Sequence, residues 1–423
     1  MKILGISEGF HDAGACLIED GNILYASHSE RYSKIKNDKW LHPSQLKNAD
    51  LVVFYEKRWL KNLRKLLNLQ GFNRTKTKYD ISYGHHKSHA SAGYYTSPFQ
   101  DCNILVIDAI GEFDTVSAWD NMNKLWSKRY PYSLGLLYSA ITKRIGLNPN
   151  EDEYITMGMS AYGEPKYDLS ELLYRNNHKG IPNYYLKNAR PEDLAASVQD
   201  LYEKELLKLV NKLPKKNLVI MGGCALNCVA NSKIQNKNIW IMPNPGDCGS
   251  SLGAAALAYG KHLNWVDPYL GYMLPRSNVK EIVKELLKNK VCGVASERAE
   301  FGPRALGNRS LLGDCRYPIK DTVNTIKQRQ KFRPFAPAIL EEYAKDYFEG
   351  PMNEYMQFVA KAKHDYESVT HVDGSARVQI VKPTCRSVIR QILEEWFDKT
   401  GVPMLLNTSL NINGNNIVNF PHT

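Results

Sequence analysis

The chain has 423 residues, of which 43% are hydrophobic, and its 55 Lys and Arg exceed its 44 Asp and Glu to give a formal net charge of +11. This length and composition fit two or three globular domains, and the absence of any apolar run of about 18 residues excludes a membrane-spanning helix from the expected elements. The excess of cations favours a phosphorylated substrate, a nucleotide or a nucleic acid as a partner.

The cysteines and the first residues both favour a cytoplasmic protein. The eight cysteines form no Cys-x-x-Cys pair, which is typical of a reduced chain. The first residues predict a β-strand and show no signal sequence. We therefore expect a cytoplasmic location, in a bacterium or a phage-infected host, and no membrane partner.

A turn between two short strands is the first candidate site. Residues 2–7 and 15–19 are rich in apolar residues and predict a hairpin. The turn between them contains His11 and Asp12, with glycines on both sides. Such a turn can present main-chain N–H groups and polar side chains to a ligand.

Residues 56–78 carry the densest positive charge and predict an amphipathic helix. The apolar positions are Trp59, Leu60, Leu63, Leu66 and Leu67, and the cations are Lys57, Arg58, Lys61, Arg64 and Lys65. We expect the cations to form a solvated helix face.

Two histidines and an aspartate form the strongest candidate metal site. His85 and His89 are four residues apart, so a helix would place both imidazoles on one face. Asp108 ends the apolar run 104–107, which predicts a buried strand. Two imidazoles and a carboxylate suit Fe(II), Mn or Zn. A zinc protease is not favoured, because the Glu of its His-Glu-x-x-His motif is absent.

Glycine-rich turns follow two later strands. Strand 217–220 is followed by Gly222, Gly223 and Asn227 and then by a predicted helix, a geometry that can bind an anion. A second strand is followed by a loop with Asp247 at the start of the next helix. From the spacing alone, Asp247 could equally cap that helix. The alternation of strands and helices predicts an α/β protein with a mixed sheet.

The last third of the chain is rich in arginine. We expect a linker at residues 265–275, after which arginines recur close to Gly and Ser. Arginines in such loops suit a pocket for phosphate or carboxylate, although exposed loop arginines are equally common. The positions of interest are Arg304, Arg309, Arg329, Arg333 and Arg377, followed by Ser409 after an apolar strand.

Taken together, these motifs resemble the NodU/CmcH family of O-carbamoyltransferases, typified by the tobramycin, cephamycin and nodulation-factor enzymes. The resemblance covers nearly the whole chain. The motifs that carry it are FHDA, ERYSKIK, HHKSHA with DAIGE, MGMSAYGEP, GGCALN, NPGDCGSSLGAA, EFGPRALGNRS, FRPFAPAIL, THVDGSARVQ and TGVPMLLNTSLN.

The resemblance implies two domains. Residues 1–272 would form an actin-like ATPase (ASKHA) domain, similar to TsaD, with two related halves and a nucleotide and a metal between them. Residues 276–423 would form an α+β YrdC-like domain that makes carbamoyladenylate from carbamoyl phosphate and ATP with Mg, and releases pyrophosphate. The first domain would then transfer the carbamoyl group to an acceptor hydroxyl. An oligomer is compatible with this organisation.

The family motifs also imply roles for individual residues. The metal ligands would be His85, His89, Asp108 and Asp247, and the nucleotide in the first domain would contact Gly222, Gly223 and Asn227. Carbamoyl phosphate and ATP would bind Arg304, Arg309, one or more of Lys327, Arg329 and Arg333, and then Arg377 and Ser409. The catalytic residues would be His11, as the base for the acceptor hydroxyl, with Asp12 and Ser409.

The chain departs from the family pattern near its end. The family has Gly-Glu-Pro-Ile where this chain has residues 414–417, Gly-Asn-Asn-Ile, and it continues for a helix and a strand beyond the position of Thr423. We therefore expect a second domain that is shortened or closed differently.

Two other functions fit parts of the sequence. An actin-fold metabolite kinase would release ADP, but it gives no role to the arginines of the second domain. A nucleic-acid-binding protein would fit the charge alone. For the acceptor, the basic charge favours a hydroxymethylated pyrimidine as nucleotide or DNA, and an antibiotic or saccharide hydroxyl is the alternative.

Overall fold

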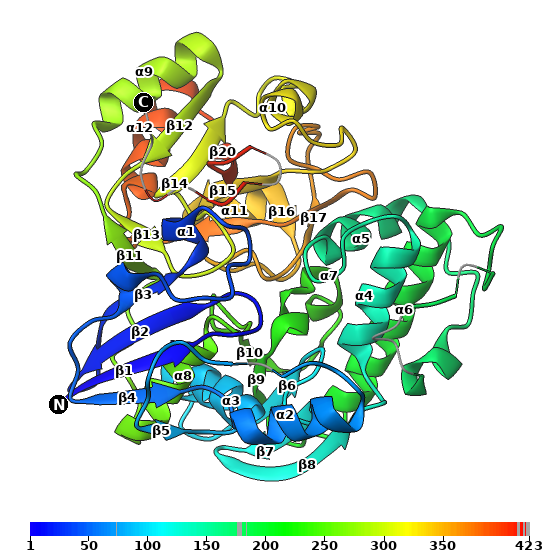
Figure 1. The fold of residues 1–423 in the computed structure, drawn as a ribbon. Coiled ribbons are helices and arrows are strands. Elements are labelled where there is room, and N and C mark those ends of the chain that lie inside the picture. The colour runs from blue at the N-terminus through cyan, green and yellow to red at the C-terminus, as the bar shows by residue number, and fades with distance from the viewer. Residues whose placement is uncertain (73, 176–179, 183, 413–414, 418, 420–423) are drawn as a thin grey trace. The chain divides into compact units, whose positions relative to one another are not determined.

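The computed structural model describes residues 1–72, 74–175, 180–182, 184–412, 415–417 and 419 (Figure 1). Gly414 and Thr423, at which the chain departs from the family pattern, lie outside this part. The fold divides into two compact units. Unit 1 comprises Met1–Ser29 and Asn37–Val266, and unit 2 comprises Glu30–Lys36 and Asp267–Thr423. No helix among the described residues is long and apolar enough to cross a membrane.

Unit 1 contains two five-stranded sheets. The first has the order β3-β2-β1-β4-β5 and the second has the order β8-β7-β6-β9-β10. The strands of the first sheet are β1 (Lys2–Ser7), β2 (Gly14–Glu19), β3 (Asn22–His28), β4 (Leu51–Phe54) and β5 (Ile81–Ser82). Those of the second are β6 (Asn103–Ile107), β7 (Asp114–Asp120), β8 (Asn123–Arg129), β9 (Asn217–Met221) and β10 (Asn238–Trp240).

The two sheets share one topology. In the first, β1 and β2 pair antiparallel, as do β2 and β3, while β4 lies parallel on the other side of β1 and carries β5. In the second, β6, β7 and β8 repeat the antiparallel run, and β9 and β10 repeat the parallel pair. Unit 1 is therefore a mixed α/β fold made of two halves with the same strand order and direction.

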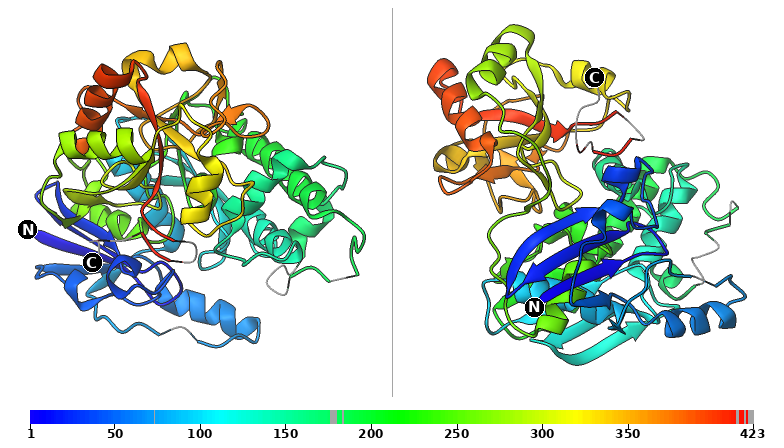
Figure 2. Two further views of the ribbon diagram at one scale, coloured as in Figure 1. Left: turned by 90° about the horizontal axis from the view of Figure 1, so that it is seen from above. Right: turned by 60° about the vertical axis from the view of Figure 1, so that its left-hand side comes forward.

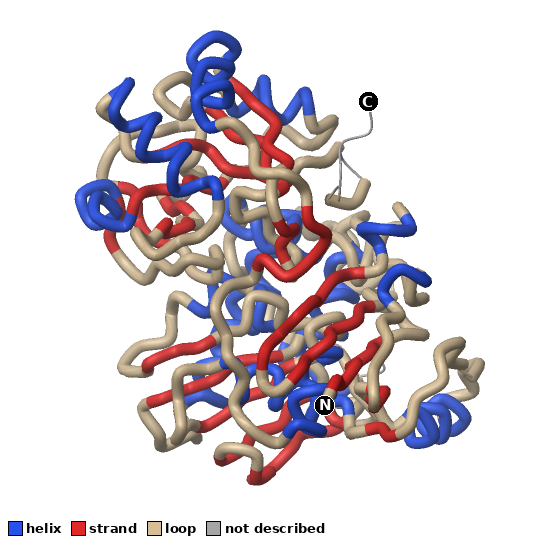
Figure 3. Tube along the Cα trace, turned by 90° about the vertical axis from the view of Figure 1, so that its left-hand side faces the viewer, coloured by secondary structure: helices blue, strands red, loops and turns tan. Residues whose placement is uncertain are grey.

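Two helices, α3 (His85–Thr96) and α8 (Ser250–Tyr259), pack on these sheets and on each other. Helix α3 contacts β6 and β9, whereas α8 contacts β1 and β2. Their close approach depends on Gly253, where an added Cβ would lie 1.9 Å from the main-chain oxygen of Ser88. The remaining helices of unit 1 are α2 (Arg58–Leu67), α4 (Leu134–Arg144), α5 (Glu153–Met159), α6 (Pro191–Val210) and α7 (Cys228–Asn231). Figure 3 distinguishes the helices, in blue, from the strands, in red.

Unit 2 is built on one five-stranded mixed sheet with the order β12-β14-β20-β15-β19. Its strands are β12 (Val291–Ala295), β14 (Arg309–Gly313), β15 (Ala336–Leu340), β19 (Gln379–Val381) and β20 (Met404–Ser409). Helices α9 (Val279–Asn289) and α12 (Val388–Thr400) bury one apolar cluster against this sheet. A second cluster on the sheet includes residues of α10 (Lys320–Ile326), α11 (Glu341–Tyr347) and the small sheet β16 (Phe348–Glu349), β17 (Ala360–Ala362) and β18 (Ser375–Ala376). Helix α1 (Glu30–Ser33) also belongs to unit 2.

The boundary between the units, at Val266 and Asp267, lies within the linker expected at residues 265–275. Most of that segment belongs to unit 2, where it contains a strand, β11 (Tyr269–Met273), that pairs with β13 (Arg298–Glu300). Two other expectations from the sequence are wrong. The helix expected after Gly222 and Gly223 is only a short 3₁₀ turn followed by the four residues of α7.

The second wrong expectation concerns α2, whose two faces are inverted. Arg58, Lys61 and Arg64 are buried, at 8%, 2% and 4% exposure. Trp59 and Leu66 are exposed. The reason is a fully buried carboxylate next to the helix, Glu56, which pairs with Lys61 at 2.7 Å and with Arg58 at 3.2 Å.

Candidate functional site

Two histidines on one helix form the centre of the candidate site in unit 1. Helix α3 begins at His85, and one turn later His89 projects from the same face. Their Nε2 atoms lie 3.1 Å apart, and both side chains are buried. The segment after them, Ala-Ser-Ala-Gly, has small side chains that let α3 pack closely on α8.

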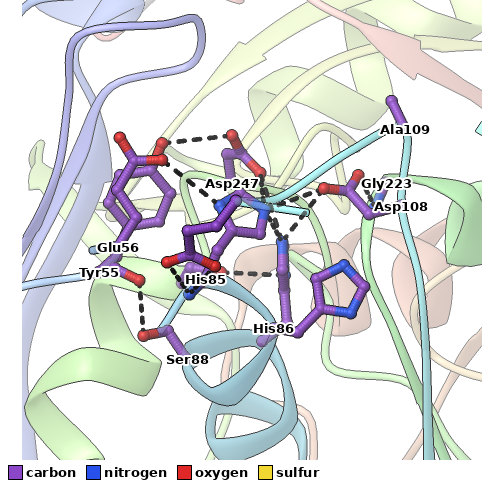
Figure 4. Close-up of polar contacts among 12 residues, drawn as sticks. Tyr55, Glu56, His85, His86, Ser88, Asp108, Ala109, Gly223 and Asp247 are labelled. Carbon is purple, nitrogen blue, oxygen red and sulfur yellow. Dashed lines mark hydrogen bonds and ion pairs between the residues drawn. The ribbon is translucent and has the colours of Figure 1, made fainter. Parts of the chain in front are cut away.

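Two aspartates complete the cluster from other elements (Figure 4). Asp108 directly follows β6, and its Oδ2 lies 2.9 Å from His85 Nε2. Asp247 lies in the loop before α8, and its Oδ1 is 3.3 Å from the Nε2 atoms of both His85 and His89. Asp247 does not cap α8, because the residue at the N-cap is Gly249. We call these four residues the His/Asp cluster.

The donor set of the His/Asp cluster fits a divalent metal ion. One ligand atom from each of the four buried residues lies within 4.8 Å of all the others. Ligand atoms that share an ion at about 2.1 Å are expected roughly 3 Å or more apart, which matches the separations of the Nε2 and carboxylate atoms. Imidazole and carboxylate ligands suit Fe, Mn and Zn. The four residues are those that the family motifs implied.

The side chains of the cluster shift one another's pKa values. Burial opposes ionisation, but the attraction of Asp247 and the contact with Asp108 hold the pKa of His85 well above its usual range. Burial likewise acts to raise the pKa of Asp247, but the neighbouring His85 holds it well below its usual range. A divalent ion would replace the positive charge of a protonated histidine between these carboxylates.

Further side chains contact three of the four residues of the His/Asp cluster. Ser250 Oγ lies 2.9 Å from His89 Nδ1, and Glu56 Oε2 lies 3.7 Å from His85 Nδ1. The Tyr55 hydroxyl donates to Asp247 Oδ2 at 3.5 Å. None of these three residues was predicted from the sequence. Position gives the one available signal, since Tyr55 and Glu56 directly follow β4 just as Asp108 follows β6.

The predicted base lies beside the cluster. His11 Nε2 is 4.0 Å from Asp247 Oδ2, and His11 Nδ1 is 3.6 Å from Asp12 Oδ2. Burial alone would lower the pKa of His11, but its contact with Asp12 and the charge of Asp247 raise it to about 9. Asp12 has a positive φ of 48°, which turns the chain between β1 and β2.

The glycine turn after β9 supports the cluster rather than forming the start of a long helix. Gly222 has φ of +92°, and an added Cβ would lie 2.1 Å from the Ile107 carbonyl oxygen. The Gly223 N–H donates to Asp108 Oδ1 at 3.4 Å. The Asn227 side chain caps α7 and exchanges hydrogen bonds with Gln199. Contact of these three residues with a nucleotide stays a prediction.

In unit 2, several predicted residues gather at one end of the main sheet. Strands β15 and β19 are parallel, and β20 runs antiparallel to β14 and β15. The starts of β14, β15 and β19 therefore meet the end of β20. Arg309 begins β14, Arg333 precedes β15, Arg377 precedes β19, and Ser409 ends β20. We call this group the basic sheet end.

Lys327 is tied to Ser409 in this group. Its Nζ donates to the Ser409 carbonyl oxygen and to the main-chain and side-chain oxygens of Asn411, the latter two at 2.9 and 2.7 Å. Burial, together with the charges of Arg329 and Arg333, lowers the pKa of Lys327 to about 7. Lys327 thus holds the loop after β20.

The arginines of this part of unit 2 differ in the hydrogen-bond partners of their guanidinium N–H groups. Arg309 is buried and gives its guanidinium N–H groups to five main-chain oxygens, so contact with a substrate would require some of these bonds to open. These oxygens belong to Tyr272, Ser296, Glu297, Asn308 and Asn419. Arg329 donates to Asn324 at 2.6 Å and stacks on Phe335. Arg304, Arg333 and Arg377 are half-buried, and the Nε of Arg377 has no hydrogen-bond partner among the described residues.

The sequence matches known families over most of its length. Residues 44–189 and 180–256 match the profile of the carbamoyltransferase N-terminus, and residues 283–423 match that of the carbamoyltransferase C-terminus. The chain therefore belongs to the carbamoyltransferase family and is a transferase, which confirms the family and the enzyme class predicted from the motifs.

Curated relatives support this assignment. An uncharacterized protein of Synechocystis is 32% identical over an alignment that covers 99% of this chain and 92% of the relative. Nodulation protein NolNO of Sinorhizobium fredii is 30% identical, with 96% of this chain and 75% of that protein covered. Nodulation protein U of the same species is 35% identical over 53% of this chain and 46% of its own length.

Solved structures are more distant. The activator of the 2-hydroxyisocaproyl-CoA dehydratase from Clostridium difficile, with bound ADPNP, is 18% identical with a TM-score of 0.43, and 62% of this chain and 95% of that chain are covered. HypF of T. kodakarensis is 13% identical with a TM-score of 0.35, and 61% of this chain and 47% of that chain are covered. These TM-scores are too low to assign a ligand.

Proposed function

We propose that the protein is an ATP-dependent O-carbamoyltransferase in which unit 2 makes carbamoyladenylate and unit 1 transfers the carbamoyl group to an acceptor hydroxyl. One observation carries the assignment of transfer to unit 1: the family motifs bring His85, His89, Asp108 and Asp247 into one buried cluster. The repeated topology of unit 1 supports an actin-like ATPase fold, and the mixed sheet of unit 2 is compatible with a YrdC-like domain.

The chemistry of activation suits the basic sheet end. Carbamoyl phosphate loses its phosphate to water, and the resulting carbamate oxygen displaces pyrophosphate from the α-phosphorus of ATP, bound with Mg, to form carbamoyladenylate. Both substrates are anions that repel each other. Arginine guanidinium groups neutralise this repulsion and bind phosphate oxygens in pairs. Arg304, Arg333 and Arg377 are the residues that we propose for this contact.

The transfer step is a substitution at the carbamoyl carbon. The acceptor oxygen forms a bond to that carbon, the bond to the adenylate oxygen breaks, and AMP leaves. His11, beside the His/Asp cluster, takes the hydroxyl proton in its neutral form. A divalent ion at the cluster would favour that form, because its charge opposes the rise in the pKa of His11 that Asp12 and Asp247 cause. The carboxylate of Asp12 then stabilises the imidazolium that forms. A divalent ion held by the cluster, which we propose to be Fe(II) with Mn or Zn as alternatives, supplies a Lewis acid for the carbamoyl oxygen.

The acceptor is proposed from charge. With +11 over the chain, an anionic acceptor is favoured over a neutral one. A hydroxymethylated pyrimidine, as nucleotide or in DNA, combines a primary hydroxyl with phosphate. A saccharide or antibiotic hydroxyl is the alternative acceptor.

Product analysis by mass spectrometry tests the proposal. The protein receives ATP, carbamoyl phosphate and a panel containing a hydroxymethyl nucleotide, hydroxymethylated DNA and an aminoglycoside. We expect AMP, pyrophosphate and one acceptor that gains a carbamoyl group. ADP as the nucleotide product, without any carbamoylated acceptor, would contradict the proposal and favour a kinase.

Two variants separate the proposed half-reactions. Asp108→Asn, in the cluster, is expected to abolish carbamoylation while pyrophosphate is still released. Arg377→Ala, in the basic sheet end, is expected to lower both. If Asp108→Asn stopped pyrophosphate release as strongly as carbamoylation, the division of labour between the units would be wrong.

A further inference from the structure

Helix α2 turns its charged side inward. At about 100° per residue, Arg58, Lys61 and Arg64 lie on one side of the helix, and all three are buried. Lys61 and Arg58 pair with Glu56, and Arg58 also donates to the main-chain oxygen of Glu8 at 2.7 Å. The orientation of the helix is thus fixed by buried ion pairs rather than by its apolar residues.

The opposite side of α2 is apolar and faces solvent. Trp59, Leu63, Leu66 and Leu67 are exposed by 66%, 43%, 55% and 69%, and Leu69 just after the helix by 97%. We call the four helix residues the outer face of α2. Figures 1 and 2 place this helix at the periphery of unit 1.

The area of the outer face is large for an isolated monomer. A Trp or Leu side chain contributes on the order of 100–200 Å², so the outer face and Leu69 together expose several hundred Å². The largest apolar patch of a typical monomer measures about 300–600 Å² and is often functional. A standard interface buries about 800 Å² per partner, so this apolar surface would supply a large part of a dimer interface, and residues around the helix would have to supply the rest.

We propose that the outer face of α2 is a homodimer interface in which two copies of the chain pair through this helix. A two-fold dimer requires a surface that is complementary to itself. An uninterrupted apolar row meets this requirement, because no charge on it has to find an opposite charge. Leu63 stands at the middle of the row, so it would lie near the two-fold axis and contact Leu63 of the partner.

A membrane surface is the less favoured occupant. Helices that lie on membranes flank their apolar face with cations that reach lipid headgroups. Here three cations of α2 are turned into the protein, and Lys61 and Arg58 are neutralised by Glu56. The exposed side of the helix is therefore apolar, and most of the cations of the helix lie on its buried side.

Analytical ultracentrifugation of the full chain tests the proposal. We expect a mass of twice 48.1 kDa for the unmodified protein at micromolar concentration. Leu63→Glu places two like charges at the axis and is expected to raise the dissociation constant by at least about 30-fold, and Leu63→Lys should do the same. A mixture of the two variants should restore the dimer, because each pair then joins opposite charges.

The controls distinguish other occupants. Leu125→Glu changes an equally exposed leucine, 50% exposed on β8, and should leave the dimer intact. A monomer at all concentrations, or a dimer that Leu63→Glu does not weaken, would overturn the proposal. So would a monomer that binds vesicles of anionic phospholipid in a Leu63-dependent manner, which would assign the face to a membrane. Circular dichroism checks that each variant is folded.

Discussion

His85 and His89 use their two ring nitrogens for different purposes. Each Nε2 points into the His/Asp cluster, whereas the Nδ1 atoms face Glu56 and Ser250. A hydrogen bond at the second nitrogen fixes the tautomer and the orientation of a metal-binding imidazole. Ser250 is within hydrogen-bond distance of His89, at 2.9 Å, whereas Glu56, 3.7 Å from His85 Nδ1, acts on His85 through its charge. The cluster therefore depends on residues that do not belong to the ligand set.

Removal of one ligand should abolish tight metal binding. For His89→Ala we expect the affinity for Fe(II), Mn or Zn to fall by more than about 100-fold, because the loss exceeds that of an outer partner. Titration calorimetry and elemental analysis of the purified protein measure this change. The control is His364→Ala, which alters an exposed histidine in unit 2. Equal metal content in the two variants would exclude the cluster as the metal site.

Loss of the carboxylate behind His85 should weaken metal binding without removing a ligand. For Glu56→Gln we expect the affinity to fall by about 10–100-fold, the usual range for an outer partner. The variant also leaves Lys61 buried without its counter-charge, which costs about 3–5 kcal/mol of stability. Lys61→Met serves as the comparison, because it perturbs the same ion pair but keeps Glu56. If both variants bind metal equally well, Glu56 does not orient His85.

Lys327 should make the free energy of unfolding depend on pH above about pH 7. Burial lowers the pKa of Lys327 from 10.5 in the unfolded chain to about 7 in the fold. Between these pH values the unfolded chain binds more protons, so the free energy of unfolding should rise with pH, by up to about 1.4 kcal/mol per pH unit. Below about pH 7 this contribution is constant. Urea unfolding at pH 7 to 9.5 should show a smaller slope for Lys327→Met, and an unchanged slope would contradict the assignment.

The four residues of the His/Asp cluster were predictable from the sequence, whereas the residues around them were not. The four-residue spacing of His85 and His89 and the position of Asp108 after an apolar run are local signals, and the family motif added Asp247. Ser250 carries no such signal, and Glu56 carries only its position after the apolar strand β4. Their roles arise when β4 and α8 approach α3, and this contact exists only in the folded protein.

At the scale of elements, the pattern of α2 predicted two faces but not their direction. An amphipathic pattern normally turns its apolar side to the core. In α2 the buried carboxylate of Glu56 reverses this, because an unpaired charge would cost more than exposed leucines. A sequence pattern of 10 residues holds no information about a charge that the tertiary fold buries beside it.

The contact between α3 and α8 can be tested with a matched pair of substitutions. Gly253→Ala would place a Cβ 1.9 Å from the Ser88 oxygen and force the helices apart. We expect a lower melting temperature and weaker metal binding, because α3 carries both histidines. Gly158→Ala in α5 meets open space and should stabilise the protein by up to about 1 kcal/mol. Equal effects of the two substitutions would show that the helices do not need this close contact.

At the scale of the whole molecule, the repeated topology of unit 1 explains how the cluster is assembled. Helix α3 follows the last strand of the first sheet, and α8 follows the last strand of the second. The equivalent helices begin at the cluster, where α3 supplies both histidines and the loop before α8 supplies Asp247. The end of a strand in each half adds a carboxylate, Glu56 after β4 and Asp108 after β6, although these two strands are not equivalent in the repeat. The two halves thus contribute to one site, and only the helices do so from related positions.

The net charge of the molecule yields a prediction about the acceptor. An excess of 11 positive charges attracts a phosphorylated acceptor over a distance that salt screens, with a Debye length of about 10 Å at 0.1 M and about 3 Å at 1 M. We expect kcat/KM for a hydroxymethyl nucleotide to fall several-fold between 50 and 300 mM potassium chloride. An uncharged saccharide without amino groups serves as the control acceptor in the same salt series. The change in its kcat/KM reports the effect of salt on the binding of ATP and carbamoyl phosphate. If both acceptors lose activity in the same proportion, the charge serves the anionic cosubstrates, and a neutral hydroxyl acceptor becomes the better assignment.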